Sequence, residues 1–254
     1  YPQLGWGHTD VVLFNSWLPT DTGPTMGHPT LGRAGHNLAG DYQVLEGQVA
    51  YALPALSPDG RTVAYDRAGE PWLYHVGRGY EQVTFDLSDY EPVDGAQFRA
   101  GSPAWSPDGS KVAWVIGGDF ASLGGWRIGT GVLDLESGTT SFFHPYQPVG
   151  SGGWPPAPSW SPDGQWLALS AGAVVRGGLE TWIVDLEGQE YNVGLCSVWV
   201  WSPDGRRLAC TSIPQSLGAG VWVVEVDSWD VHGLDLPEGA KLIGWIDPKL
   251  AGRP

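Results

Sequence analysis

A five-residue phrase, Trp-Ser-Pro-Asp-Gly, constrains the fold of this chain more than any other feature of its sequence. It begins at Trp105, Trp160 and Trp201, and a variant with leucine in the first position begins at Leu56. Serine, proline and aspartate in this order favour a type I turn, and the glycine suits the left-handed conformation that follows in a three-residue β-hairpin. Each copy therefore predicts the tip of a hairpin.

The residues that follow the phrase repeat as well. Seven positions after each first residue comes an aliphatic residue and then alanine, as in Val112-Ala113 and Leu208-Ala209. The four copies start 41 to 55 residues apart, and each interval contains enough apolar segments for four short strands. Four strands in a period of about 40–50 residues are typical of a β-propeller blade.

Two weaker copies extend the series at its ends, Leu4-Gly5-Trp6 and Ile243-Gly244-Trp245. They share an aliphatic-Gly-Trp opening but lack the Pro-Asp-Gly turn. We therefore predict an all-β fold, a single β-propeller domain over residues 1–254 made of four-stranded antiparallel blades. Five blades are expected, with residues 241–246 adding to the first blade to close the ring.

The turn phrase, the aliphatic-Ala strand after it and later strands such as residues 181–186 resemble the TolB-type, WD-like β-propeller repeat. This family includes the C-terminal domain of the periplasmic protein TolB and the propeller domains of prolyl-oligopeptidase-like and tricorn-like peptidases. The resemblance covers about residues 48–246. It implies a scaffold role and, as the alternative to five blades, a six-bladed ring that is incomplete here. Because the motif is structural, the resemblance transfers no catalytic residue.

Composition and charge exclude several classes of function. Asp and Glu number 28 against 13 Lys and Arg, and the resulting net charge of −15 repels nucleic acid and anionic membrane surfaces. No run of about eighteen apolar residues occurs, so no membrane span is expected. The chain begins at Tyr1 without a signal peptide. We interpret it as a processed periplasmic or extracellular protein, or as a piece of a longer chain.

Two cysteines, Cys196 and Cys210, flank one predicted hairpin. If Ser202 and Arg206 border its turn, Cys210 lies opposite Val198, and Cys196 is its diagonal neighbour on the same face. Diagonal side chains lie about 7 Å apart, which is further than a relaxed disulfide allows. Two buried thiols are therefore favoured, and a disulfide is the alternative.

Function is expected at one end of the blades. In a propeller, the A–B and C–D turns lie at one end, and the B–C and D–A loops lie at the other. The phrase makes the turn end uniform, whereas the loop end varies, and variable loops on a rigid frame commonly carry function. Aromatic residues there are candidate contacts for a ligand or partner, or else they cap the spaces between blades. The candidates are Tyr90, Phe120, Trp126, Tyr146 and Trp154.

No recognised catalytic or metal-binding pattern is present in the sequence. The motif aspartates repeat at a turn position, where aspartate accepts hydrogen bonds from nearby backbone. There is no Gly-x-Ser-x-Gly elbow and no phosphate loop, and His28 and His36 lack a zinc-ligand spacing. We therefore expect no catalytic residue, no metal and no cofactor.

These observations together predict a non-catalytic extracytoplasmic scaffold, not an enzyme, that binds a protein partner through its loop end. Two alternatives stay open. The same aromatic residues could recognise a small ligand or a carbohydrate, or the chain could be the propeller portion of a larger peptidase or hydrolase.

Overall fold

A computed structural model describes four strands between residues 3 and 47 and, more fully, residues 54–95, 98–146, 155–175, 178–212, 220–236, 242, 244 and 245. The described residues are almost entirely strand and turn, with one short 3-10 helix, η1 (Ser88–Tyr90). Contacts divide the chain into two compact units, and each is described by itself. The first is Tyr1–Pro145 with Trp154–Pro158, and the second is Tyr146–Gly153 with Ser159–Pro254. The single-domain assignment stays a prediction.

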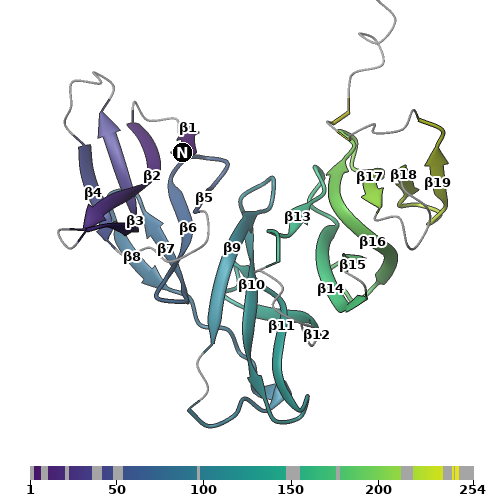
Figure 1. Cartoon of the computed structure of the whole chain (residues 1–254), viewed down its shortest axis with the longest axis horizontal. Coiled ribbons are helices and arrows are strands. Elements are labelled where there is room, and N and C mark those ends of the chain that lie inside the picture. The colour runs from purple at the N-terminus through teal and green to yellow at the C-terminus, as the bar shows by residue number, and fades with distance from the viewer. Residues whose placement is uncertain are drawn as a thin grey trace, which may run out of the picture. The chain divides into compact units, whose positions relative to one another are not determined.

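The first three sheets are four-stranded and antiparallel, and their strands follow chain order, A to D (Figure 1). Blade 1 consists of β1 (Gln3–Trp6), β2 (Val11–Thr20), β3 (Gly23–Gly35) and β4 (Tyr42–Gly47). Blade 2 consists of β5 (Ala55–Leu56), β6 (Thr62–Arg67), β7 (Glu70–His75) and β8 (Gly79–Gln82). Blade 3 consists of β9 (Arg99–Trp105), β10 (Lys111–Phe120), β11 (Gly125–Asp134) and β12 (Thr140–Tyr146).

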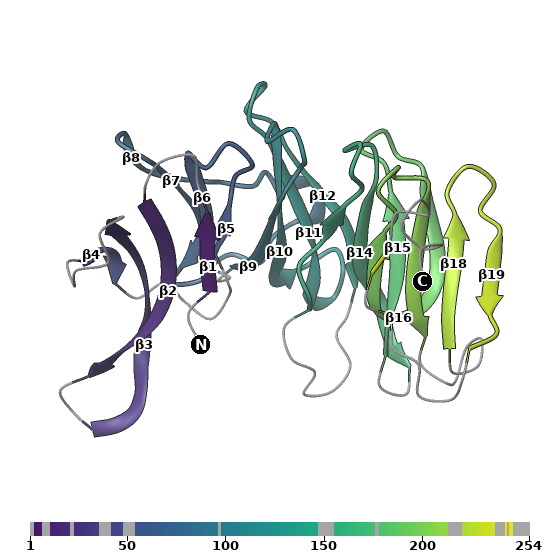
Figure 2. The ribbon, with the colours of Figure 1, turned by 90° about the horizontal axis from the view of Figure 1, so that it is seen from above.

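The remaining strands form one seven-stranded antiparallel sheet, again in chain order (Figure 2). They are β13 (Ser159–Trp160), β14 (Leu167–Val175), β15 (Gly178–Val184), β16 (Glu190–Trp201), β17 (Arg207–Ser212), β18 (Gly220–Glu225) and β19 (Val231–Leu234). The long strand β16 is shared: its first part pairs with β15 as strand D of blade 4, and its last part pairs with β17 as strand A of blade 5. The prediction of an all-β fold of four-stranded antiparallel blades is confirmed, and the sheets are consistent with five blades. Among the described residues, no strand from the segment 241–246 pairs with blade 1, so the expected closure of the ring stays a prediction.

Each copy of the repeated phrase forms the predicted hairpin tip. In blade 3, the Gly109 amide donates to the Ser106 carbonyl at 2.9 Å, which closes the turn. Gly109 has a φ of 73°, and the glycines of the other three copies lie within two degrees of it. An L-residue with a side chain rarely adopts this conformation, so the turn requires glycine. The weak first copy is also a hairpin, since Trp6 pairs with Val12.

The first residue of the phrase ties neighbouring blades together. The Trp105 indole N–H donates to the carbonyl of Ala55 at 3.0 Å, and the Trp201 indole donates to the carbonyl of Ser159 at 3.0 Å. Each acceptor immediately precedes the first residue of the previous copy. Tryptophan is therefore favoured at this position because it combines apolar bulk with one donor aimed at the preceding blade.

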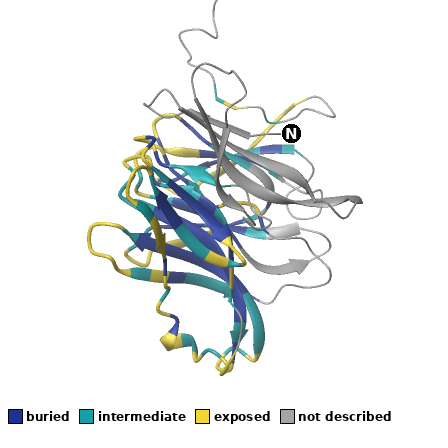
Figure 3. Cartoon of the chain, turned by 90° about the vertical axis from the view of Figure 1, so that its left-hand side faces the viewer, coloured by how far each residue is buried: buried dark blue, intermediate teal, exposed yellow. Residues whose placement is uncertain are grey.

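In two copies, the alanine after the phrase lies where sheets pack face to face. Ala64 and Leu73 of blade 2 are fully buried in one cluster with Val112 and Trp114 of blade 3. Blades 4 and 5 form a second such cluster, which contains Ala168. Buried residues follow the strands, and exposed residues gather at turns and loops (Figure 3). The small side chain lets the larger residues of the next blade approach closely.

The two cysteines form a disulfide, Cys196–Cys210, so the preference for free thiols was wrong. Cys210 pairs with Trp199 rather than with Val198, and a bulge lies between Cys196 and Val198 in β16. The extra residue shortens the diagonal, leaving the two Cα atoms 5.7 Å apart. That spacing suits a disulfide.

The B strands run further than the sequence suggests. In blade 3, β10 continues through Gly117 and Gly118 to Phe120, and only residues 121–124 form the turn before β11. Two glycines in this stretch allow it, because a Cβ on Gly118 would lie 2.2 Å from the Phe98 ring. The loop end of blade 3 is therefore largely an extended hairpin.

Candidate functional site

The D–A loop between blades 2 and 3 is fixed onto the tip of the β10–β11 hairpin. After η1, Glu91 has a φ of 47° and turns the chain, and its carbonyl accepts the Ala121 amide at 2.8 Å. Val93 donates its amide to Asp119 at 3.1 Å, and the Ser122 hydroxyl donates to the Tyr90 carbonyl at 2.6 Å. These contacts join segments about thirty residues apart into one rigid surface, which we call the blade 3 loop surface (residues 86–95 and 119–124).

An aromatic cluster lies beneath this surface. The rings of Tyr90 and Phe120 pack edge to face with centroids 6.0 Å apart, and Tyr90 meets Phe142 in the same way at 5.2 Å. Phe98 completes the cluster at 5.4 Å from Phe120. The Tyr90 hydroxyl donates to the Phe142 carbonyl at 3.1 Å. Burial, followed by the nearby Asp89 charge, raises the pKa of Tyr90.

The predicted site residues differ in what they can offer a partner. Phe120 is fully buried and Tyr146, the last residue of β12, is buried, with its pKa raised to about 12 by desolvation. Tyr90 and Trp126 are half-buried and keep some surface at the loop end. Trp154 lies outside the described residues. The structure thus brings Tyr90 and Phe120 together, with Phe120 as the support, and binding by any of these residues stays a prediction.

Sequence reasoning missed the exposed part of this surface. Val93 is 43% exposed, one of the more exposed large apolar side chains among the described residues. Exposed Asp89, Glu91 and Asp94 surround it in the sequence. A single valine in a polar loop gives no periodic signal in the sequence. Only the structure shows that Val93 is exposed on a loop whose backbone is hydrogen-bonded to the β10–β11 hairpin.

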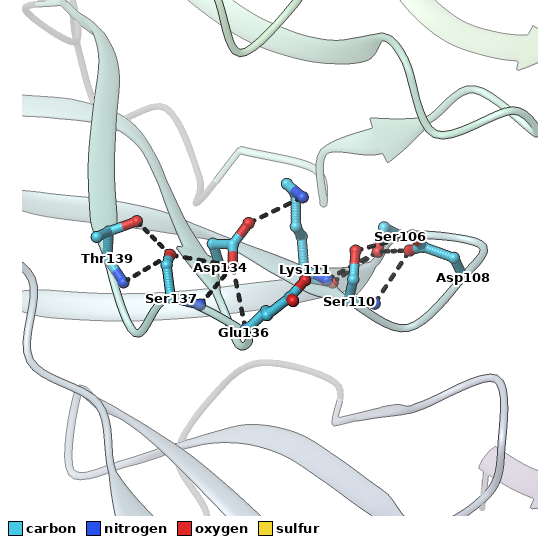
Figure 4. Close-up of polar contacts among 8 residues, drawn as sticks. All are labelled: Ser106, Asp108, Ser110, Lys111, Asp134, Glu136, Ser137 and Thr139. Carbon is cyan, nitrogen blue, oxygen red and sulfur yellow. Dashed lines mark hydrogen bonds and ion pairs between the residues drawn. The ribbon is translucent and has the colours of Figure 1, made fainter.

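The turn end has a different polar network, shown for blade 3 in Figure 4. The Ser106 hydroxyl donates to Asp108 at 2.6 Å and accepts the Lys111 amide at 2.9 Å, and the Ser110 amide donates to the same carboxylate at 3.0 Å. These hydrogen bonds, that of Ser106 foremost, hold the pKa of Asp108 below its ordinary value. The same bonds recur around Asp59 and Asp204, with the same effect on pKa. The interpretation of the motif aspartates as turn residues is confirmed.

One arrangement at the turn end has the composition of a catalytic triad. Thr62 Oγ1 lies 3.1 Å from His75 Nδ1, and His75 Nε2 lies 2.9 Å from a Glu81 carboxylate oxygen. However, Thr62 and His75 are directly paired across β6 and β7. Lys111 and Asp134 form an ion pair at 2.9 Å in the same place in blade 3. The arrangement is therefore a variant of a cross-strand pair that recurs at the turn end of the blades.

Among the described residues, no group of three or more His, Cys, Asp or Glu side chains lies close enough to hold a metal ion, and His28 and His36 fall outside the described side chains. In the same part of the chain, no helix is long and apolar enough to cross a membrane.

Comparison with known proteins identifies the fold but no family. No protein-family model matches the chain, and no curated protein resembles it in sequence. Dipeptidyl peptidase 4 from Porphyromonas gingivalis is similar in structure, with 13% identity and a TM-score of 0.57 over 85% of this chain and 37% of the peptidase. Acylaminoacyl peptidase from Pyrococcus horikoshii shows 14% identity and a TM-score of 0.55 over 92% and 39%.

The specific likeness to TolB stays a prediction. TolB from Acinetobacter baumannii is 15% identical, with a TM-score of 0.48 over 87% of this chain and 50% of TolB. That score is too low to favour TolB over other propellers. The coarser part of the prediction, a β-propeller fold, is confirmed.

The prediction that the protein is not an enzyme is contradicted, because the proteins that share its fold over most of its length include peptidases, at 13% and 14% identity. The prediction rested on the absence of catalytic motifs in the propeller, which does not exclude a catalytic group elsewhere in an enzyme. The chain spans only 37% to 50% of the length of the three proteins compared. A catalytic group can lie in the part of such a protein that the propeller does not include.

Proposed function

We propose that this chain is the propeller part of a larger hydrolase of the peptidase type. One observation carries the proposal: two peptidases match 85% and 92% of the chain, whereas the chain accounts for 37% and 39% of them. The contacts at the turn end are consistent with a structural role for the propeller. At the described turn end of blade 3, Ser106 and Asp108 bond to each other within the turn, and Lys111 and Asp134 pair across strands.

The protein from the complete reading frame tests this proposal. We expect a fluorophosphonate probe to label it at a serine outside residues 1–254, and we expect it to release p-nitroaniline from peptide anilides. Residues 1–254 expressed alone serve as the control and should show neither reaction. A complete protein that neither binds the probe nor cleaves any anilide would refute the proposal, and so would labelling within the propeller.

We further propose that the blade 3 loop surface contacts the partner of the propeller, whether a catalytic domain or a bound peptide. Its support is the fixed loop that presents Val93 beside half-buried Tyr90, with Trp126 in the adjoining strand. Phe120 would hold Tyr90 in place from below, and Tyr146 stays a candidate contact. Trp154 stays a candidate for the same role.

A matched pair of exposed valines tests the loop surface. Val93 lies at the loop end, and Val76, which is similarly exposed, lies in the C–D turn of blade 2 at the turn end. We expect Val93→Asp to lower kcat/KM of the complete protein roughly tenfold, since a charge replaces an apolar contact. Val76→Asp should leave it unchanged. Equal effects of the two substitutions would exclude a specific role for the loop end.

The Cys196–Cys210 disulfide also bears on location. Disulfides persist in oxidising compartments. We therefore infer that the protein works in the periplasm or outside the cell, and fractionation of the source cells would test this.

A further inference from the structure

Aspartate precedes glycine at five places in the chain, and the structure describes all five pairs. One of them, Asp94-Gly95, lies in the blade 3 loop surface, and the other four belong to the repeated phrase. The motif pairs are Asp59-Gly60, Asp108-Gly109, Asp163-Gly164 and Asp204-Gly205. An aspartate side chain can react with the backbone amide that follows it, and glycine favours this reaction because it has no side chain to hinder the amide nitrogen.

Hydrogen bonds hold both reacting groups of each motif pair. In blade 3, the Asp108 carboxylate accepts the Ser106 hydroxyl at 2.6 Å and the Ser110 amide at 3.0 Å. The Gly109 amide donates to the Ser106 carbonyl at 2.9 Å. The other three copies of the phrase have the same three bonds. In every motif pair, the carboxylate and the amide nitrogen are therefore each bonded to another group.

The pair in the loop surface has none of these bonds. Among the described residues, no hydrogen-bond partner contacts the Asp94 carboxylate or the Gly95 amide. Both residues are exposed, and a Cβ on Gly95 would meet no atom within 4 Å. Exposure alone does not distinguish the pairs, since the motif aspartates are exposed as well. The difference lies in the bonding of the two groups that would react.

We propose that Asp94-Gly95 is a site of spontaneous covalent modification, at which the folded protein forms a succinimide and then isoaspartate. The Gly95 nitrogen attacks the carboxyl carbon of protonated Asp94, forming an N–C bond, and the carboxyl hydroxyl leaves as water with the amide proton. Water then adds to one of the two ring carbonyls. Opening at the side-chain carbonyl restores aspartate, and opening at the main-chain carbonyl gives isoaspartate. The only co-reactant is water.

The motif hydrogen bonds oppose the same reaction in a second way. The hydroxyl leaves from the protonated carboxyl group, and several bonds, that of Ser106 foremost, hold the pKa of Asp108 below its ordinary value. The pKa values of Asp59 and Asp204 are lowered in the same way. At mildly acidic pH, a smaller fraction of these carboxyl groups is therefore protonated and able to react.

The modification would change the main chain of the blade 3 loop surface. Isoaspartate adds one carbon atom to the backbone directly after Val93, whose amide donates to the Asp119 carbonyl at 3.1 Å and whose side chain is exposed. The inference does not rest on the proposed function, because the reaction requires only the pair itself and water.

Peptide mapping by mass spectrometry tests the site. Residues 1–254 would be kept folded at mildly acidic pH, sampled over weeks and digested. Succinimide lowers the mass of a peptide by one water, and isoaspartate shifts its retention and fragmentation. Products at Asp94 should accumulate at least about tenfold faster than at any motif aspartate, because only the motif pairs need local opening. In concentrated urea, where the turns are lost, all five pairs should react at comparable rates.

Two substitutions separate the reaction from the protection. Asp94→Glu keeps the charge but would have to close a larger ring, so products at this position should disappear. Ser106→Ala removes one hydrogen bond from Asp108, so products at Asp108 should increase. They should stay below those at Asp94, because the Gly109 amide keeps its bond to the carbonyl of residue 106. The rate at Asp94 should not respond to Ser106→Ala.

Several outcomes would overturn the proposal. Equal rates at Asp94 and the motif aspartates in the folded chain would do so, as would conversion of Asp94 in urea alone. Products that persist in Asp94→Glu would place the reaction at another residue. An unchanged rate at Asp108 in Ser106→Ala would remove the bonding difference on which the choice of Asp94-Gly95 depends.

Discussion

The two ends of blade 3 hold their chain by opposite means. At the turn end, Ser106, Asp108 and Gly109 form a network of neighbouring residues that recurs almost unchanged in three other blades. At the loop end, Tyr90, Phe120 and Phe142 meet once, from three separate segments. The contacts at the turn end are common to the repeats, whereas the contacts at the loop end are specific to blade 3.

The largest expected effect comes from the loop end. Phe120 is fully buried and contacts three other rings. We expect Phe120→Ala to lower the free energy of unfolding by about 3–5 kcal/mol, because it removes apolar contact and leaves a cavity. Chemical denaturation measures this, and Trp126→Ala, at a half-buried position nearby, should cost less. Little change for Phe120→Ala would mean that the aromatic cluster does not support the loop.

Replacing a turn-end glycine with alanine should have a smaller effect on stability, and the size of the effect should differ between copies of the phrase. Gly109 and Gly205 share a φ near 72°, so alanine at either position costs about 1–2 kcal/mol in backbone strain. A Cβ on Gly205 would also lie 2.9 Å from an Asp163 carboxylate oxygen, whereas on Gly109 the nearest atom is Pro58 Cδ at 3.5 Å. We therefore expect Gly205→Ala to destabilise more than Gly109→Ala, by thermal or urea unfolding. The reverse order would mean that the close approach of Asp163 to Gly205 does not decide the cost of the substitution.

The sequence predicts the turn end well because all of its contacts are local and repeated. Serine, aspartate and glycine lie within four positions of one another, and four copies of the phrase identify what is constant. The loop end could not be predicted in this way. Tyr90 and Phe142 are 52 residues apart, and their meeting depends on a 3-10 turn, a left-handed Glu91 and a longer β10, none of which repeats. The disulfide was not predicted for a similar reason. A single bulge in β16 shifts its pairing with β17 and brings Cys196 close to Cys210.

A single hydroxyl tests how far the loop end depends on its polar bond. We expect Tyr90→Phe to lower the free energy of unfolding by about 1 kcal/mol, because it removes the bond to the Phe142 carbonyl but keeps the ring packing. Hydrogen exchange should show the loss around residues 86–95. The matched change at the other end, Ser106→Ala, should instead affect exchange only at its own turn. Spread of either effect to the opposite end would mean that the two ends are coupled.

The smallest expected effect is a difference between the two ends in how their contribution to folding stability depends on pH. Folding lowers the pKa of Asp108, chiefly through the Ser106 hydrogen bond, so the ionised form is favoured in the folded state. Its contribution to stability is complete above the unfolded pKa of about 3.9 and is lost as pH falls through the lower folded value. Folding raises the pKa of Tyr90 through burial. That contribution is complete below about pH 10 and is lost as pH rises through the higher folded value.

The turn end should therefore weaken in acid and the loop end in alkali. Urea midpoints measured across both ranges would test this, with one variant for each end. Ser106→Ala should return the pKa of Asp108 toward its ordinary value and flatten part of the acid slope, which carboxyl NMR shifts would follow directly. Tyr90→Phe should flatten part of the alkaline slope and leave the acid one unchanged, because it removes a titrating hydroxyl and no carboxylate. If both substitutions altered the same limb, the polar contacts of the two ends would not be independent.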